Sequence, residues 1–447
     1  MPGHASALGR MLRPVIHPLE GTPHDFDRLM ELIGDARLVL LGEATHGTHE
    51  FYRIRGEITK RLIREKGFGA VAVEADWPDA YRVNRWVRGG SGDADATEAL
   101  GGFRRFPQWM WRNADVLDFV GWLRSWNDAR PDEGPRVGFY GLDLYSMHAS
   151  MEAVLAYLRL VDPEAEQRAR NRYACFEHFG EDPQRYGYAA AFGLSASCEQ
   201  AVVDQLIDLR RSAAEYARRD GRIAPDALFF AEQNARLVRN AERYYRAMFG
   251  DRVTSWNLRD THMVETLEAL LVQLGGEWHP PKVVLWAHNS HLGDARATDM
   301  GVSGELNVGQ LVRSRWGHES MLVGFTTYDG TVTAASDWGE PAQRMRVRPA
   351  LEDSYEAAFH ETGVRNFLID LRSPNELVAN LERPRLERAI GVIYRPDTER
   401  LSHYFHARLP SQFDAVLHYD ATRAVEPLER TGAWERGELA ETYPTAL

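Results

Sequence analysis

The sequence is poor in cysteine and in long apolar runs. Its 447 residues include only two cysteines, Cys175 and Cys198, so a disulfide framework is not expected and a reducing compartment is the natural one. No window approaches the roughly 20 apolar residues of a membrane span, and the N-terminal MPGHASALGRMLRPVI has no apolar signal core. These absences favour a cytoplasmic protein that does not contact membranes.

The sequence also has no excess of positively charged residues. Asp and Glu (65) outnumber Lys and Arg (53), which gives a formal net charge of −12. Nucleic-acid binding through the phosphate backbone needs a basic face, so the composition argues against it. The proportions of hydrophobic (44%) and charged (26%) residues are those of a globular protein. We expect a monomer or a homodimer.

The clearest pattern that is present is an apolar run followed by a polar turn. Leu38–Leu41 reads LVLL, as in a strand buried on both faces, and the turn GEATHG then brings Glu43 and His46 before a helical period begins. Open α/β sheets bind ligands beyond the carboxyl ends of their strands, so both side chains are candidates for chemistry. A plainer interpretation is that Glu43 caps the helix and His46 is an ordinary loop histidine.

The same pattern recurs along the chain. Three further strand candidates end on polar side chains: Ala70–Val73 on Glu74, Val137–Leu142 on Asp143, and Val283–Ala287 on His288 with His291. Parallel strands bring their carboxyl ends to one edge of a sheet, so we expect these groups to converge. For Asp143 a helix N-cap is the favoured single role, and support of a neighbouring site residue is the alternative.

The order of elements predicts an α/β fold. Strand candidates alternate with helical patterns, which indicates a central, mostly parallel sheet with helices on both faces. From 148 to 250 the pattern is helical, so we expect an inserted helical subdomain that roofs the site, while 1–147 and 251–447 form the core. Residues 1–24 read as an arm with little structure. Further strand candidates are Met321–Thr327, Asn366–Asp370, Ala389–Tyr394 and Asp414–His418.

Common nucleophile motifs are absent. There is no G-x-S-x-G elbow, since Gly193–Ser197 reads GLSAS and Gly301–Gly304 reads GVSG. Neither cysteine lies near the polar turns, which disfavours a thiol nucleophile. Histidines and carboxylates remain, and these can activate water. His46 could take a proton from water if Glu43 or Glu74 orients its other nitrogen.

The oxygen that becomes negative during ester hydrolysis also needs hydrogen-bond donors. We expect these to be Arg55, a protonated His288 or amides at a helix terminus. We expect no cofactor. A metal-dependent hydrolase that uses zinc or manganese is the alternative. Neither Glu43-x-x-His46 nor His288-x-x-His291 is the H-E-x-x-H signature, so metal-free activation of water is preferred. The metal ligands of the alternative would be Glu43, His46, Glu74, His288 and His291.

Five stretches carry a family resemblance. They are GEATHGTHEFYRIR, AVAVEADWPDAYRVNRWVRG, SWNLRDTHM, VVLWAHNSHLGD and QFDAVLHYDATRAVEPL, in this order over nearly the whole chain. Together they resemble the erythromycin esterase family, also labelled succinoglycan-biosynthesis-like proteins. The resemblance implies that His46 is the general base and that Glu43, Glu74, Arg55 and His288 support it. It also moves Arg259 from a surface ion pair toward a role in shaping the site.

The expected activity is therefore cleavage of a small-molecule ester or lactone. Opening of a macrolide macrolactone, which would give antibiotic resistance, is its most concrete form. The rival is a non-catalytic accessory protein of polysaccharide biosynthesis, in which the same groups bind a sugar acid or an acyl group. The motifs do not specify a substrate. Substrate contacts are expected from Trp77, Asp143, Arg259 and His291.

Overall fold

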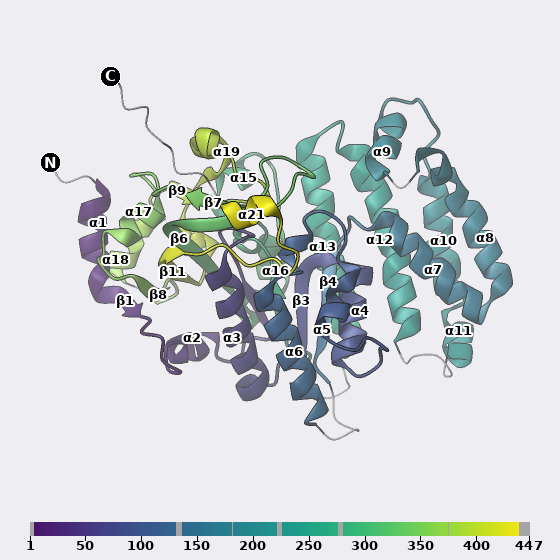
Figure 1. Cartoon of the computed structure of the whole chain (residues 1–447), viewed down its shortest axis with the longest axis horizontal. Coiled ribbons are helices and arrows are strands. Elements are labelled where there is room, and N and C mark those ends of the chain that lie inside the picture. Colours follow the sequence, from purple (N-terminus) through teal and green to yellow (C-terminus); the bar gives the residue numbers. More distant parts are fainter. Residues whose placement is uncertain are drawn as a thin grey trace.

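A nine-stranded sheet runs through the centre of the chain (Figure 1). The computed structural model describes residues 4–130, 136–180, 182–220, 226–275, 280–373 and 375–437. In this part of the chain the strand order is β1-β8-β11-β6-β2-β5-β3-β4, with β7 paired to β6. The strands are β1 (Ile16–Pro18), β2 (Leu38–Leu41), β3 (Ala70–Asp76), β4 (Gly138–Asp143), β5 (Val283–Trp286), β6 (Ser320–Ala334), β7 (Gln343–Val347), β8 (Asn366–Asp370) and β11 (Ala415–Thr422).

Most neighbouring strands are parallel. The pairs β2/β5, β5/β3, β3/β4, β2/β6 and β6/β11 are all parallel. The antiparallel pairs are β1/β8, β8/β11 and β6/β7. The predicted α/β class with a mostly parallel sheet is confirmed.

Helices cover both faces of the sheet, and β2 shows the consequence. Leu38 and Leu40 belong to a core that includes α13 (Arg252–Leu274) and α16 (Val308–Trp316). Val39 and Leu41 belong to a second core, with α3 (His49–Lys66) and α6 (Ala114–Asp128). All four side chains are fully buried. A strand covered on both faces needs a continuous apolar run rather than alternation.

Two expectations from the sequence are wrong. Ala389–Tyr394 is not a strand in the described chain but makes isolated bridges, because Ile390 pairs its backbone with the turn after β2. The strand lies just before it: β9 (Arg385–Arg388) pairs antiparallel with β10 (Tyr404–Ala407) in a separate two-stranded sheet. In the N-terminal arm, the described residues from 4 onward form α1 (His4–Leu12) and β1, which pairs with β8.

A block of helices follows β4 and stands beside that edge of the sheet (Figure 1). It occupies the segment expected to form the inserted subdomain. Through α12 (Ala227–Ala247) it packs against α4 (Trp77–Val87) and α13. Its helices are α7 (Met147–Val161), α8 (Pro163–Tyr173), α9 (Pro183–Ala191), α10 (Glu199–Arg211), α11 (Ala213–Asp220) and α12 (Ala227–Ala247).

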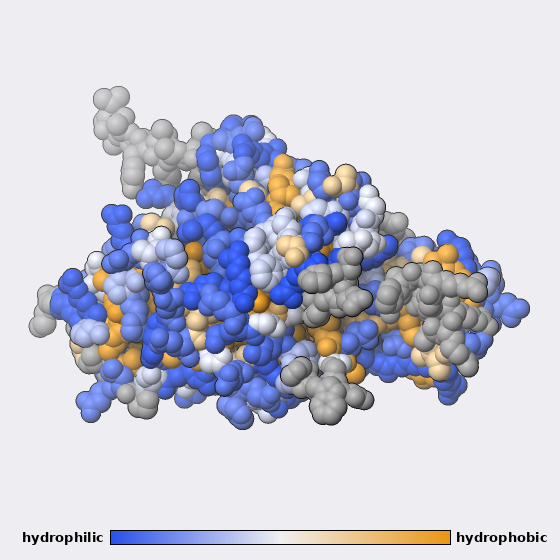
Figure 2. Space-filling model, turned by 90° about the horizontal axis from the view of Figure 1, so that it is seen from below, coloured by the Kyte–Doolittle hydropathy of each residue, from blue (hydrophilic) through white to orange (hydrophobic). Residues whose placement is uncertain are grey.

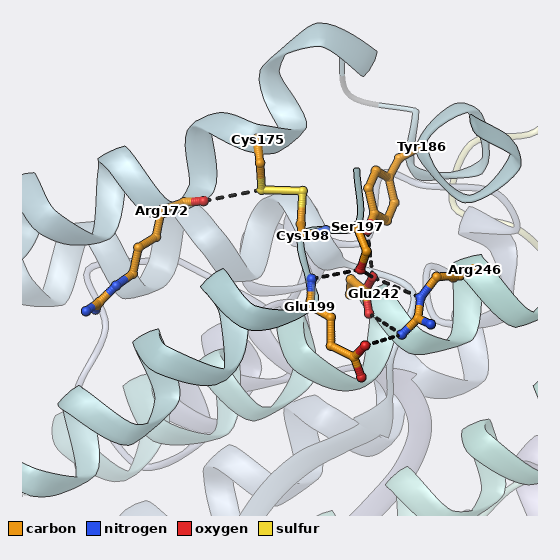
Figure 3. Close-up of a disulfide and its surroundings, with 8 residues drawn as sticks. All are labelled: Arg172, Cys175, Tyr186, Ser197, Cys198, Glu199, Glu242 and Arg246. Atoms are coloured by element: carbon orange, nitrogen blue, oxygen red, sulfur yellow. Dashed lines mark hydrogen bonds and ion pairs between the residues drawn. A yellow bond between two sulfur atoms is a disulfide. The ribbon is translucent and has the colours of Figure 1, made fainter. Parts of the chain in front are cut away.

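The two cysteines are joined in this block, contrary to the expectation from their scarcity. Cys175 and Cys198 form a disulfide with their Cα atoms 6.0 Å apart (Figure 3). Next to it the buried Glu242 accepts hydrogen bonds from Tyr186 Oη (2.6 Å) and Ser197 Oγ (3.0 Å). The number of cysteines in a sequence does not show whether helix packing brings two of them together.

Reduction of the disulfide is expected to lower the free energy of unfolding by about 3 kcal/mol, because the bridge closes a loop of about 20 residues in the unfolded chain. Denaturant unfolding with and without dithiothreitol measures this. Cys175→Ser should match the reduced wild type and should not respond to the reductant. A wild-type midpoint that is unchanged by dithiothreitol would contradict the prediction.

Among the described residues, no helix combines the length and apolarity needed to cross a membrane. Hydrophilic side chains cover most of the face shown in Figure 2, with apolar ones in separate patches. Several exposed large apolar side chains belong to the helical block and its ends: Leu160, Tyr188, Phe192, Leu194 and Phe249.

Candidate active site

The polar turns gather at one edge of the sheet because their strands are neighbours. In the order β2-β5-β3-β4, Glu43 with His46 follow β2 and His288 with His291 follow β5, while Glu74 lies near the end of β3 and Asp143 is the last residue of β4. The cleft beyond them has a volume of about 520 Å³, which is in the range of small-molecule sites. Six predicted site residues line it: His46, Glu74, Asp143, Arg259, His288 and His291.

His46 is held by both the side chain and the backbone. Its Nδ1 lies 2.9 Å from Glu43 Oε1, and its carbonyl oxygen accepts a hydrogen bond from Tyr52 Oη (2.8 Å). A carboxylate only accepts hydrogen bonds, so Nδ1 carries the proton and Nε2 is left as the acceptor. Nε2 lies 3.9 Å from Glu74 Oε1 in the cleft.

Arg55 stands behind this pair and does not line the cleft. Its Nη2 donates to Glu43 Oε2 (2.6 Å), and its guanidinium lies over the rings of Tyr52 and Trp286. Arg55 is fully buried and Glu43 is 1% exposed. The expectation that Arg55 donates to the substrate oxygen is therefore wrong, because its position on α3 directs the side chain to the far oxygen of Glu43.

Glu74 lies at the centre of the cleft and is bound to Arg259. Arg259 Nη2 donates to Glu74 Oε1 (2.8 Å) and to Asp143 Oδ2 (2.7 Å), while Nε donates to Asp143 Oδ1 (3.0 Å). Burial raises the pKa of Glu74, but the neighbouring His291, His46 and Arg259 outweigh burial and hold it well below its usual range. Arg259 likewise outweighs burial and lowers the pKa of Asp143. Asp143 therefore serves as an ion-pair partner, whereas Ser146 occupies the N-cap of α7.

His288 is neutral in this setting. Burial and the nearby His46 lower its pKa to about 3. Its Nε2 donates to the Ala44 carbonyl oxygen (3.2 Å), and its Nδ1 lies 2.8 Å from Ser290 Oγ. The expected role of a protonated donor to the substrate is therefore wrong. His288 instead ties the turn after β5 to the turn after β2.

His291 is fixed by α13. Its Nδ1 lies 2.9 Å from Asp260 Oδ1, and Trp256 stacks on its ring with centroids 4.5 Å apart. Burial lowers the pKa of His291, but Asp260 and Glu74 outweigh burial and raise it. Asp260 and Trp256 were not predicted as site residues. Their spacing from Arg259 was the available signal, because positions 256, 259 and 260 share one face of a helix.

Trp77 does not line the cleft. It is 2% exposed and packs against Tyr140, Phe229 and Phe230, because the first turn of α4 directs it toward the helical block. The expectation that it contacts substrate is wrong. The aromatic side chains in the cleft come from other segments and include Phe106, Trp111, Tyr145, Trp256, Trp338 and Phe405.

A second cavity of about 790 Å³ shares Asp76, Asp79 and Arg105 with the cleft. The helical block supplies part of its wall through Pro183 and Tyr245. Burial and the nearby Asp76 raise the pKa of Asp79 to about 7. The helices thus border the binding region from the side.

In the described residues, no three His, Cys, Asp or Glu side chains are grouped so that they could hold a metal ion. Both oxygens of Glu43 are engaged, by His46 and by Arg55. The guanidinium of Arg259 already places a positive charge beside Glu74 and His291. The donor set of the metal alternative is therefore not assembled in this arrangement.

Comparisons with known proteins agree on one family. The sequence profile described as erythromycin esterase matches residues 63–422. Erythromycin esterase type II from Escherichia coli is 23% identical over 417 residues, which cover 90% of this chain and 93% of that protein. The putative hydrolase YbfO from Bacillus subtilis (strain 168) is 21% identical over 331 residues, 70% of each chain.

Solved structures share the fold. The crystal structure of a succinoglycan biosynthesis protein has a TM-score of 0.75 at 20% identity, covering 95% of this chain and 98% of that one. A mutant of the erythromycin esterase EreC in its open conformation has a TM-score of 0.66 at 18% identity, covering 94% and 98%. The profile match over most of its length shows that the chain belongs to the erythromycin esterase family.

Proposed function

We propose that the protein is a hydrolase that adds water across an ester or lactone bond, with His46 as the general base. The observation that carries this proposal is the geometry of His46. Glu43 holds Nδ1 at 2.9 Å, while the ring lines a cleft large enough for a small molecule. Membership of the erythromycin esterase family supports the same reaction class.

The water molecule would bind between His46 and Glu74. With 3.9 Å between His46 Nε2 and Glu74 Oε1, one water can donate a hydrogen bond to each. As the water attacks the substrate carbonyl, its proton moves to His46 Nε2. Glu43 then stabilises the imidazolium through Nδ1, and Arg55 holds Glu43 in place.

The carbonyl oxygen becomes negative during the attack and needs a positive partner. Arg259 is the candidate, because it lines the cleft and a guanidinium keeps its charge at any physiological pH. Its links to Asp143 and Glu74 fix its orientation before substrate binds. The departing alkoxide can recover the proton that His46 has taken up.

Bulky esters and lactones suit the binding region. The cleft has aromatic walls, and the neighbouring cavity extends it toward the helical block. A macrolide macrolactone is the most specific substrate that we propose, because two of the related proteins are erythromycin esterases. Purified protein incubated with erythromycin and with simpler lactones and esters tests this. Gain of one water, read by mass spectrometry, is the expected result.

Glu74→Gln separates catalysis from mere binding. We expect kcat to fall at least about 100-fold. A glutamine whose oxygen faces His288 N presents its NH2 group, a donor, where Glu74 Oε1 would accept a hydrogen bond from the water. Its amide oxygen can still accept from His288 N, which Glu74 Oε2 does at 2.8 Å, so the fold and ligand binding should persist. Glu50→Gln, at a buried glutamate that pairs with Arg423 and does not line the cleft, is the matched control and should change kcat only a few-fold.

The accessory role in polysaccharide biosynthesis is the second candidate. It is favoured by the likeness to the succinoglycan biosynthesis protein. Saccharide binding by a wild type that hydrolyses no ester in the panel would support this role and overturn the hydrolase proposal.

A further inference from the structure

Asn289 is the junction between the two histidine-bearing turns. Its backbone N–H donates to the Glu43 carbonyl oxygen (2.8 Å). Its side-chain Nδ2 donates to the Phe325 carbonyl oxygen (2.8 Å), and its Oδ1 accepts from Phe325 N (3.3 Å). Asn289 is fully buried. Because it follows His288 directly, its position sets where the turn after β5 meets the turn after β2.

The space around this amide is closed. A Cβ atom on Gly42 would overlap with Asn289 Oδ1, so the amide fills the place of a side chain at the end of β2. A small rotation of the amide would therefore collide with the backbone or break a hydrogen bond. The position of the Asn289 amide therefore also depends on the group that contacts it on the side away from Phe325 and Gly42.

Glu387 of β9 is that group. Its Oε1 accepts a hydrogen bond from Asn289 Nδ2 (3.2 Å). Three residues later, Ile390 N donates to the Ala44 carbonyl oxygen (2.8 Å), and the Ile390 carbonyl oxygen accepts from His46 N (3.3 Å). One short segment therefore holds both turns, the first through its backbone and the second through the side chain of Glu387.

We propose that Glu387 is a positioning residue of the hydrolytic site, which acts by holding Asn289 and thereby the relative placement of the turns that carry His46 and His288. It does not line the cleft, so it has no direct contact with substrate. The effect on turnover rests on the proposed function, whereas the effect on the position of Asn289 does not.

The surroundings of Glu387 favour its neutral form. It is fully buried and faces Asn289, Gln412 and the equally buried Glu356 of α17 (Tyr355–His360). Glu387 Oε2, Glu356 Oε2 and Gln412 Oε1 have no hydrogen-bond partner among the described residues. All three are acceptors, so a proton on Glu387 would supply the missing donor. Burial, and then the charge of Glu356, raise the pKa of Glu387 to about 8.

Two substitutions test the proposal by turnover. Glu387→Gln keeps a neutral side chain that can accept from Asn289, so kcat at pH 7 should stay within about threefold of wild type. Glu387→Ala removes the contact and should lower kcat about 100-fold, with a much smaller change in KM because most of the cleft wall comes from other segments. A purely structural role would lower the melting temperature of both variants and would not separate kcat from KM.

The pH profile adds a signature of the neutral carboxyl. Wild-type kcat should fall about tenfold per pH unit above about 8, because Glu387 ionises there and repulsion from the charge of Glu356 pushes its side chain away from Asn289. Glu387→Gln has nothing to ionise and should lack this fall. Glu356→Gln is the matched control: it removes the charge that repels the ionised Glu387, so the fall should be weaker.

Crystal structures of both variants give a readout that needs no substrate. In Glu387→Ala the Asn289 amide should leave Phe325 and the turn containing His288 should shift, while Glu387→Gln should keep both in place. An unmoved turn in Glu387→Ala, or a kcat in that variant equal to wild type, overturns the proposal. So does an alkaline fall in Glu387→Gln that matches the wild type. If no ester is hydrolysed but the turn shifts as expected, the hydrolase proposal fails and the positioning inference stands.

Discussion

His46→Ala is expected to lower kcat by about 10⁴-fold, the upper end of the effect of a general base. The loss should appear in kcat, because water activation occurs in the chemical step, and the free energy of unfolding should change little. Steady-state hydrolysis of the best ester in the panel, followed as gain of one water, measures the effect. Glu43→Gln should give a smaller loss, because His46 would keep its imidazole but lose the carboxylate that stabilises its charge.

His360 provides a matched control for this experiment. It also pairs with a carboxylate, Asp420, at 2.8 Å, but it does not line the cleft. His360→Gln should keep kcat within about twofold. Retention of more than a tenth of wild-type kcat in His46→Ala would show that another group takes the proton from water.

Arg259→Leu is expected to be the most destabilising single change in the site, by about 3–5 kcal/mol. The guanidinium is 12% exposed, and its partners Glu74 and Asp143 are 4% and 6% exposed. Its removal leaves two buried carboxylates without their cation. Urea unfolding at pH 7 measures the loss, and turnover should also disappear because the proposed partner of the negative oxygen is gone.

The dependence of this loss on pH follows from the lowered pKa values of Glu74 and Asp143. In the wild type their ionised forms stabilise the fold above about pH 4, and that contribution is lost as the pH falls through their folded-state pKa values. Without Arg259 these pKa values rise, so the two carboxyl groups take up protons more readily in the variant. Protonation removes the destabilising effect of their unpaired buried charges. The difference in stability between wild type and variant should therefore be smaller at pH 4 than at pH 7.

An exposed ion pair supplies the control for charge removal as such. Arg348 and Asp397 pair at 3.0 Å with side chains that are 50% and 93% exposed. Arg348→Leu should change stability by less than about 1 kcal/mol. If Arg259→Leu is no more destabilising than Arg348→Leu, the buried cluster does not depend on its cation as described.

Much of the site could be predicted from where polar residues follow apolar runs. Glu43 and His288 come shortly after a buried strand, Glu74 and Asp143 lie in the last residues of one, and parallel strands leave their carboxyl ends at one edge. Six of the nine predicted side chains line the cleft. The others are Glu43 and Arg55, which stand behind His46, and Trp77, which packs in the core.

Other features could not be predicted, because they depend on contacts between distant segments. Asp260 beside Arg259 resembled an exposed pair of little value, yet the packing of α13 against the sheet buries Asp260 and most of the Arg259 side chain and directs them to different partners. Ala389–Tyr394 has the composition of a strand, but Ile390 pairs with the turn after β2 instead of a neighbouring strand. Helix packing also joined the two cysteines.

The sequence by itself determined the α/β class and the residues that end the buried strands, because two-sided burial and polar turns are written in local runs of residues. Only the tertiary structure decided the charge and the role of each side chain. The strand order β2-β5-β3-β4 determines which polar turns lie next to each other. The charges of its neighbours keep Glu74 ionised, burial makes His288 neutral, and Arg259 places a positive charge beside Glu74. These states follow from distance and desolvation and not from sequence position.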